Sequence, residues 1–519
     1  MGPLRNKETQ RVKFRGIFFT FPFILTLCLA GCGGVVGTLT SVTPPSPTPN
    51  LTAADVTTLI QTAAQAAVPN TMVIAVVDRA GRILGIYRKP AAPTLATGNF
   101  GAQVDTNELA VSLARTGAFF SNDQAPLSSR TVRFISGIHF PPGITNTPNA
   151  ALYGIENTNR GCTLSTNFVS GQSISPARSI NGLSPGLGVA TGKADVNDSD
   201  ATAVNPGGVP LFRNGSLVGG IGVAGASSAV AEYAAYTAAT SNGFGPTPAA
   251  PGVIFIDGVA LPFVNQTTAP AGVGAGSFTG SFIAGPSASP GPPPEGALVA
   301  AVAGPLGGLA SSDVSQIINN SIATANTTRA VIRLPIGSSA RMSIAVADLD
   351  GTIIGLYRMP DSTVFSVDVA VSKARNVVYF SSTARTTADL KGVPMGTAVT
   401  NRTIGFGAQP FFPPGIDGSA PGPFFNLYQQ DVANPCTQGF QVAGPNQSGV
   451  VFFPGSVPLY RNGNLVGGLG VSGDGVDQDD YVAAGGSAGF EAPTAIRADQ
   501  VTVNGVRLPY QKFPTNPTN

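Results

Sequence analysis

Few side chains in this sequence of 519 residues could carry chemistry. His139 is the single histidine, and an imidazole can ligate a metal or act as an acid–base catalyst. Tyr153 and Tyr428 each lie shortly before a cysteine in a long loop, and a phenol oxygen can ligate iron. A packed histidine and two loop-anchoring tyrosines are the alternatives. Because one histidine cannot serve a triad in both halves, we predict that the chain is not an enzyme.

Two of the four cysteines lie in an N-terminal targeting segment. Basic residues from Arg5 to Arg15 precede an apolar run, Gly16 to Ala30, which is too short for a comfortable transmembrane helix. The run ends in Leu29-Ala-Gly-Cys32, which resembles the lipobox of bacterial lipoproteins, whose cysteine is lipidated and becomes the mature N-terminus. An ordinary secretory signal that contains a cysteine is the alternative.

We therefore predict a signal peptide over residues 1–32, lipid on Cys32 and a Pro/Thr/Ser-rich tether over residues 33–50. The expected location is the cell envelope, anchored to a membrane and facing the periplasm or the exterior. The other two cysteines, Cys162 and Cys436, lie in matching loops and could form a disulfide in an exported protein. Two free thiols, or a bridge to another chain, stay open because sequence does not fix pairing geometry.

A glycine-rich motif near the end of each half organises the rest of the chain. Val209 to Gly225 returns as Val457 to Gly473, and each copy has Asn-Gly between two alternating apolar runs. Such a pattern predicts a tight hairpin, because both central turn residues need positive φ. On the strand after the turn, alternate positions on one face are glycines, namely Gly220 and Gly222 in the first copy and Gly468 and Gly470 in the second.

The glycine face of this strand could accept a closely packed helix, a planar ligand or a partner sheet. We expect Val218 on the glycine face, and Leu217, Ile221 and Val223 on the other. The spacing Gly220-x-Gly222-x-x-Gly225 also matches a dinucleotide fingerprint formally. That fingerprint requires the glycines to open a helix, with an acidic residue about 20 positions later, and neither condition is met. Nucleotide binding is therefore not predicted.

The two halves repeat one another along most of their length, and the repeated segments occur in the same order: Ile74–Pro90 with Ile344–Pro360, Ala110–Arg115 with Ala370–Arg375, and Phe140–Gly143 with Phe412–Gly415. We predict two copies of one domain over residues 51–266 and 309–513. A Gly/Pro/Ala/Ser-rich linker over 267–308 joins them, and a tail follows over 514–519. Tight hairpins with segregated helices indicate an α+β fold, in which each copy is an antiparallel sheet covered by helices, with long loop inserts.

The composition bears on the class of partner. Charged residues make up only 11% of the chain and the net charge is +2, so no basic surface for nucleic acid is expected. The 65 glycines and 44 prolines favour a secreted, loop-rich protein that contains β-structure.

The Asp-x-x-Gly hairpin, the Ala-Arg helix and the final glycine-rich hairpin together resemble the GlcG/HbpS-like haem-binding family. The resemblance covers roughly residues 51–264 and 310–513. Several members are α+β domains that bind haem or related tetrapyrroles, and some are secreted and oligomerise. The chain departs from the family in its duplication, its lipid anchor and its long inserts. It also has Phe453-Pro-Gly-Ser in the second copy where the first has Asn205-Pro-Gly-Gly.

The resemblance implies haem as a cofactor, with the equivalent helical residues Arg115 and Arg375 able to pair its propionates. A salt bridge or a solvated position is the alternative for both arginines. We therefore expect a membrane-anchored, extracytoplasmic binding protein for haem or a similar planar ligand. The alternative is a non-catalytic structural or interaction lipoprotein of the envelope whose two domains form a pseudo-dimer, and a homo-oligomer is also compatible with the family.

Overall fold

The computed structural model describes residues 49–162, 186–193, 198, 200–246 and 254–518. The predicted signal peptide, Cys32 and nearly all of the predicted tether lie outside these residues. Among the helices that the structure describes, none is both long and apolar enough to cross a membrane.

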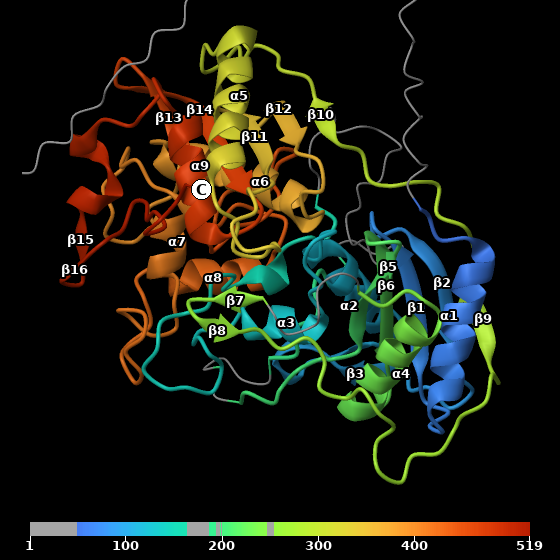
Figure 1. The fold of residues 1–519 in the computed structure, drawn as a ribbon. Coiled ribbons are helices and arrows are strands. Elements are labelled where there is room, and N and C mark those ends of the chain that lie inside the picture. The colour runs from blue at the N-terminus through green and yellow to red at the C-terminus, as the bar shows by residue number, and fades with distance from the viewer. Residues whose placement is uncertain (1–48, 163–185, 194–197, 199, 247–253, 519) are drawn as a thin grey trace, which may run out of the picture. The chain divides into compact units, whose positions relative to one another are not determined.

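The first half builds a five-stranded antiparallel sheet in the order β5-β6-β1-β2-β9 (Figure 1). Helix α2 covers one face of this sheet, and helices α1 and α4 cover the other. The main elements are α1 (Ala53–Ala66), β1 (Val73–Asp78), β2 (Ile83–Arg88), α2 (Thr106–Phe120), β5 (Gly208–Arg213), β6 (Ser216–Ala224), α4 (Ser228–Ser241) and β9 (Ser281–Ala284). Shorter elements are β3 (Leu95–Thr97), β4 (Gln103–Asp105), α3 (Ser129–Phe134), β7 (Phe255–Ile256) and β8 (Val259–Ala260).

The second half builds a sheet with the equivalent order, β10-β12-β11-β14-β13. Helix α6 covers one face, and helices α5 and α9 cover the other. The elements are β10 (Gly296–Val299), α5 (Ser311–Thr327), β11 (Ser343–Ala347), β12 (Ile353–Arg358), α6 (Phe365–Ser381), α7 (Asn401–Gly407), α8 (Phe425–Ala433), β13 (Ser456–Arg461), β14 (Asn464–Ser472), α9 (Val476–Gly486), β15 (Thr502–Val503) and β16 (Val506–Arg507). The α+β prediction is confirmed.

Local signals in the sequence account for the helix start and the turns. Thr52 and Asp55 form a capping box at the start of α1, with the Asp55 carboxylate accepting from the Thr52 amide at 2.8 Å. In the β5–β6 turn, Asn214 and Gly215 have φ of 53° and 82°, and Asn462 and Gly463 repeat this with 51° and 79°. Both central residues therefore adopt the left-handed conformation that an Asn-Gly hairpin requires.

A β-bulge changes which side chains share a face of β6. Leu211 pairs with Gly219 while the next residue, Phe212, pairs with Leu217, so Val218 is an extra residue on its strand. As a result Val218 packs with Ile221 and Val223 in the core beneath α1 and α4. The predicted alternation, which placed Val218 with the glycines, is wrong because the bulge shifts the period by one residue.

The segment over residues 267–308, predicted to be a linker, supplies one strand to each sheet. Strand β9 pairs with β2 of the first half, and β10 pairs with β12 of the second. Backbone pairing explains how a stretch with few large apolar side chains is held in place. The Asp78 carboxylate also accepts a hydrogen bond from the Ser289 hydroxyl at 3.0 Å.

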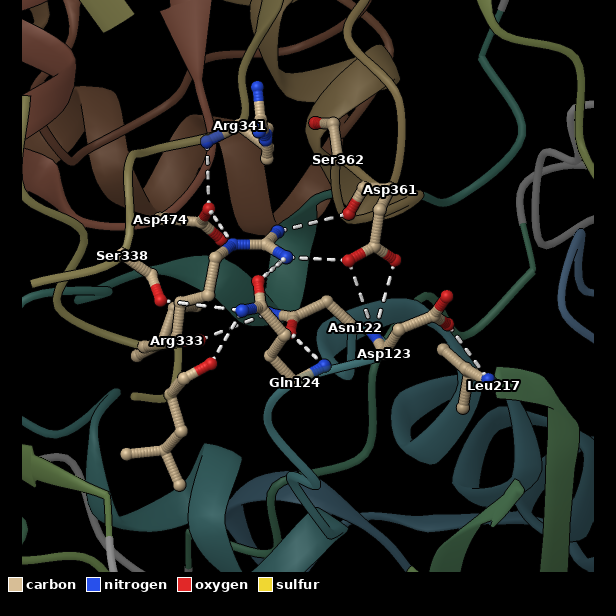
Figure 2. A network of polar contacts seen from close by, with 12 residues as sticks. Asn122, Asp123, Gln124, Leu217, Arg333, Ser338, Arg341, Asp361, Ser362 and Asp474 are labelled. Carbon is tan, nitrogen blue, oxygen red and sulfur yellow. Dashed lines mark hydrogen bonds and ion pairs between the residues drawn. The ribbon is translucent and has the colours of Figure 1, made fainter. Parts of the chain in front are cut away.

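A polar network joins the two halves (Figure 2). The Asp361 carboxylate accepts from Arg79 and from Arg333, each at 2.5 Å, and from the backbone amide of Asp123 at 3.1 Å. Arg333 also contacts Asp474 through Nε at 2.8 Å. Close by, the rings of Phe120 and Phe365 stack with centroids 4.2 Å apart. The contact between the halves is therefore both charged and apolar.

Candidate functional site

The glycine face of each repeated strand is occupied by a helix. A Cβ on Gly222 would lie 2.0 Å from the Ala110 carbonyl oxygen of α2, and one on Gly220 would lie 2.1 Å from that of Ala114. In the second half, Cβ atoms on Gly468 and Gly470 would lie 2.4 and 2.0 Å from carbonyl oxygens of α6. Of the three expected occupants, the structure has the helix, so this face offers no room for a planar ligand.

Arg115 and Arg375 each stabilise a β-hairpin turn by hydrogen bonding. Each donates through Nε to a turn carbonyl at 2.9 Å, Arg115 to Gly81 and Arg375 to Gly351. Arg115 is 6% exposed and Arg375 is fully buried. Burial lowers the pKa of each guanidinium to about 10, which leaves both charged at neutral pH. In these positions both guanidinium groups stabilise turns, and neither lines the groove of the first half or the cavity at His139.

Tyr153 and Tyr428 come together from the two halves. Their rings stack with centroids 5.3 Å apart, and the Tyr153 hydroxyl donates to the Ala408 carbonyl oxygen at 3.1 Å. Burial raises the pKa of both phenols well above the usual value. Because a protonated, stacked phenol is a poor iron ligand, the arrangement favours the packing alternative for both tyrosines.

Cys162 and Cys436 form a disulfide that links residues 274 positions apart. Of the alternatives left open by the sequence, the structure thus has the bridge between the halves. Neither sulfur is available as a thiolate nucleophile or metal ligand. In the described part of the chain, no group of three or more His, Cys, Asp or Glu side chains could hold a metal ion.

His139 lies in a cavity of about 370 Å³ to which both halves contribute. Its Nε2 is 2.6 Å from Oδ1 of Asp417, a residue of the second half, and this hydrogen bond lowers the pKa of the Asp417 carboxyl. Phe411, the counterpart of His139, also lines the cavity, and the two rings are 6.4 Å apart. A carboxylate on one ring nitrogen fixes the tautomer of a histidine and is typical of metal-ligating imidazoles.

Asp417 was missed by the sequence reasoning. Its partner His139 lies 278 positions away in the chain, and no repeat or motif connects the two residues. Only the packing of the halves brings them together.

A larger groove of about 570 Å³ lies in the first half. Helix α2 contributes Leu109 and Leu113, and the end of β6 and the start of α4 contribute Val223 and Ser227. The described lining contains no histidine, cysteine, methionine, tyrosine, lysine or arginine. The sequence signal for this groove is the difference between Leu113 of the first copy and Lys373 at the equivalent position of the second.

Comparisons with known proteins give one family match. Residues 318–488 match the family model described as "Haem degrading protein HbpS-like". A PduOC:heme complex is 24% identical, over 35% of this chain and 95% of that chain, with a TM-score of 0.23. Protein ORFY of Klebsiella pneumoniae, from family DUF336, is 20% identical, over 34% and 88%, with a TM-score of 0.22. Likeness at such TM-scores carries no weight for ligand or activity, and no curated protein matches the chain.

The family description corrects one expectation. We predicted that the chain is not an enzyme, whereas the matching family is described as haem degrading. Counting histidines for a hydrolytic triad could not anticipate this, since haem carries its own reactive iron.

Proposed function

We propose that this chain, whose residues 318–488 belong to the HbpS-like family, is an exported haem-binding protein anchored to the bacterial envelope through lipid on Cys32. The family match is the observation that carries the proposal. Export and anchoring are supported by the basic, apolar and Leu-Ala-Gly-Cys pattern of the first 32 residues.

We further infer that the first half is a second copy of the same domain. Its sheet has the equivalent strand order, and a buried ion pair recurs at equivalent positions. Arg130 pairs with Glu232 at 2.7 Å in the first half, as Arg402 pairs with Asp480 at 2.6 Å in the second.

Contacts between equivalent residues support an intramolecular pseudo-dimer. The disulfide and the His139–Phe411 contact each join a residue to its counterpart in the other copy, and the stacked tyrosines join two positions close before those cysteines. Such self-pairing is what a two-fold interface produces.

His139 is the residue of this chain best suited to hold haem iron. It lines a cavity, it has a carboxylate partner that orients its ring, and Phe411 provides an apolar wall. Bound haem would supply the redox-active iron, and the protein would supply an oriented imidazole. The groove of the first half does not fit haem, because its described lining has no histidine, cysteine, methionine or tyrosine to ligate the iron.

Titrating the purified protein with hemin tests the proposal. We expect a saturable shift of the Soret band for the wild type and at least tenfold weaker binding for His139→Ala. Asp417→Asn keeps the shape but weakens the carboxylate partner, so about 10- to 100-fold loss of affinity is expected. Tyr428→Phe is the control and should bind as the wild type does.

A featureless wild-type titration would refute haem binding, and full binding by His139→Ala would refute the site. Haem degradation is measured separately, by adding ascorbate to the loaded protein in air. Loss of the Soret band faster than for free hemin would support the activity in the family description, and an unchanged band would count against it.

A further inference from the structure

The groove of the first half has a wall that the second half lacks. From Pro90 to Ala110 the first half spans 20 positions, whereas the equivalent stretch from Pro360 to Ala370 spans 10. The additional residues form the β3–β4 hairpin, which pairs Leu95 with Asp105 and lines the groove through Leu95, Ala96 and Thr97. An insertion specific to one copy thus builds one side of this groove.

At the equivalent place the second half is filled by a buried ion pair. Lys373, the counterpart of Leu113, contacts Asp479, the counterpart of Ala231, at 3.0 Å, and the two side chains are 0% and 3% exposed. Phe453, the counterpart of Asn205, lies under the ammonium, which is 5.0 Å from its ring centroid.

The fit in the second half is tight. A Cβ on Gly455 would lie 2.5 Å from the Asp479 Cβ and 2.6 Å from the Lys373 ammonium. In the first half a Cβ on Gly207 would meet the Val223 carbonyl oxygen at 2.2 Å, much as one on Gly455 would meet the Val471 oxygen at 2.5 Å. Its next neighbour, however, is the Ala231 Cβ at 3.2 Å, and no ammonium or carboxylate side chain lies beside it. Where the second half has the Lys373–Asp479 salt bridge, the first half has the uncharged Leu113 and Ala231. Where the second half has the ring of Phe453, the first half has the smaller Asn205.

The lining restricts the kind of molecule that the groove can take. Its floor is apolar, from Leu109, Leu113, Val223 and Ala231, and its rim has uncharged polar side chains such as Thr97. The charged side chain in the described lining is Asp200, which disfavours an acid.

The first turn of α4 adds hydrogen-bond donors. Ser227 at the N-cap makes no side-chain capping bond, so amides of this 14-residue helix are left for an acceptor oxygen. A volume of about 570 Å³ lies within the range of small-molecule sites.

We propose that this groove is a second binding site, present in the first half alone, for an uncharged and mainly apolar molecule that carries a carbonyl oxygen. The apolar body lies against α2 and β6, and the carbonyl oxygen faces the start of α4. The site is separate from the cavity at His139 and does not depend on haem binding there.

Nile red, a neutral flat dye with one carbonyl, is a suitable probe for the mature protein. The wild type should bind one equivalent saturably, with a blue-shifted emission. The double change Leu113→Lys and Ala231→Asp installs the residues of the second half and should weaken binding at least tenfold. The matched control, Lys373→Leu with Asp479→Ala, makes the reverse exchange in the other half and should leave the affinity of the groove unchanged.

Thr97→Trp provides a second test in case the Leu113→Lys and Ala231→Asp variant does not fold. Thr97 is exposed at the rim, so a large ring there obstructs the groove without entering the core. This variant should also bind at least tenfold more weakly, with an unchanged circular dichroism spectrum. The proposal would be overturned if both the Leu113→Lys, Ala231→Asp variant and the Thr97→Trp variant fold and bind Nile red as tightly as the wild type does. Displacement of the dye by one equivalent of hemin would also overturn it. Failure of hemin to bind, with dye binding intact, would refute the haem proposal alone.

Discussion

Replacing Asp361 with asparagine should weaken the contact between the two halves. The substitution removes the negative charge that Arg79 and Arg333 share, yet keeps the size of the side chain and suits the backbone, whose φ is 60° at this position. Removing one partner of a fully buried ion pair costs about 3–5 kcal/mol.

Two features of the structure reduce that cost. The Asp361 side chain is 22% exposed, so water screens part of the interaction. Arg333 also keeps Asp474 at 2.8 Å, and Arg79 keeps Asp123 at 3.2 Å. We therefore expect a loss of about 2–3 kcal/mol in the free energy of unfolding at pH 7.

Urea unfolding followed by far-UV circular dichroism measures this loss, which suits a chain without tryptophan. Asp257→Asn is the matched control, because Asp257 also has positive φ, its counterpart is Asn504, and no described ion pair includes it. A loss below about 0.5 kcal/mol, or an equal loss in the control, would refute the reasoning.

The pH dependence provides an independent check. Burial raises the pKa of Asp361, but Arg79 and Arg333 outweigh burial and the net direction is downward. A lowered pKa in the folded state means that the stabilisation is present above the usual carboxyl pKa and is lost as the pH falls through the folded value. The difference between wild type and Asp361→Asn should therefore shrink as the pH falls below the usual carboxyl pKa.

Three further outcomes are expected. Burial raises the pKa of Asp368 to about 7, so the folded state loses stability as the pH rises from about 4 to about 7. The Asp368→Asn variant lacks this loss. Its free energy of unfolding, measured in urea, should therefore rise relative to the wild type by about 2 kcal/mol as the pH goes from 5 to 6.5. Gly222→Ala should lower the melting temperature by more than 5 °C through its clash with α2, whereas Gly274→Ala, where the nearest atom is 3.7 Å away, should not. Reducing the disulfide, or replacing Cys162 and Cys436 with serine, should cost about 2–5 kcal/mol in urea unfolding without abolishing the two sheets.

The features predicted well from sequence were those encoded locally. Asn-Gly at 214–215 and 462–463 specifies its own turn, and the repeat of that motif pointed to two equivalent sheets. Features that depend on packing were not accessible. The bulge at Val218 leaves no mark in the residue pattern, and the strands in 267–308 exist because neighbouring strands offer unpaired backbone groups.

The candidate site divides in the same way. His139 was found by residue type, but Asp417 was not, because their contact requires both halves to be folded. Arg115 and Arg375 were correctly recognised as equivalent, yet their role depends on turn carbonyls that only the folded hairpins present. Residue type suggested the chemistry, and only the fold showed which groups were left accessible.

The strands contributed by residues 267–308 have a consequence for aggregation. An unpaired strand edge can recruit a strand from another chain, and proteins protect such edges with short strands, prolines or covering segments. Here β9 and β10 are themselves the outermost strands at one edge of each sheet, and each is only four residues long. At the opposite edges, β5 and β13 contain Pro210 and Pro458, which cannot donate a backbone hydrogen bond. Each sheet thus ends in a short strand at one edge and a proline-containing strand at the other, and both features disfavour strand addition.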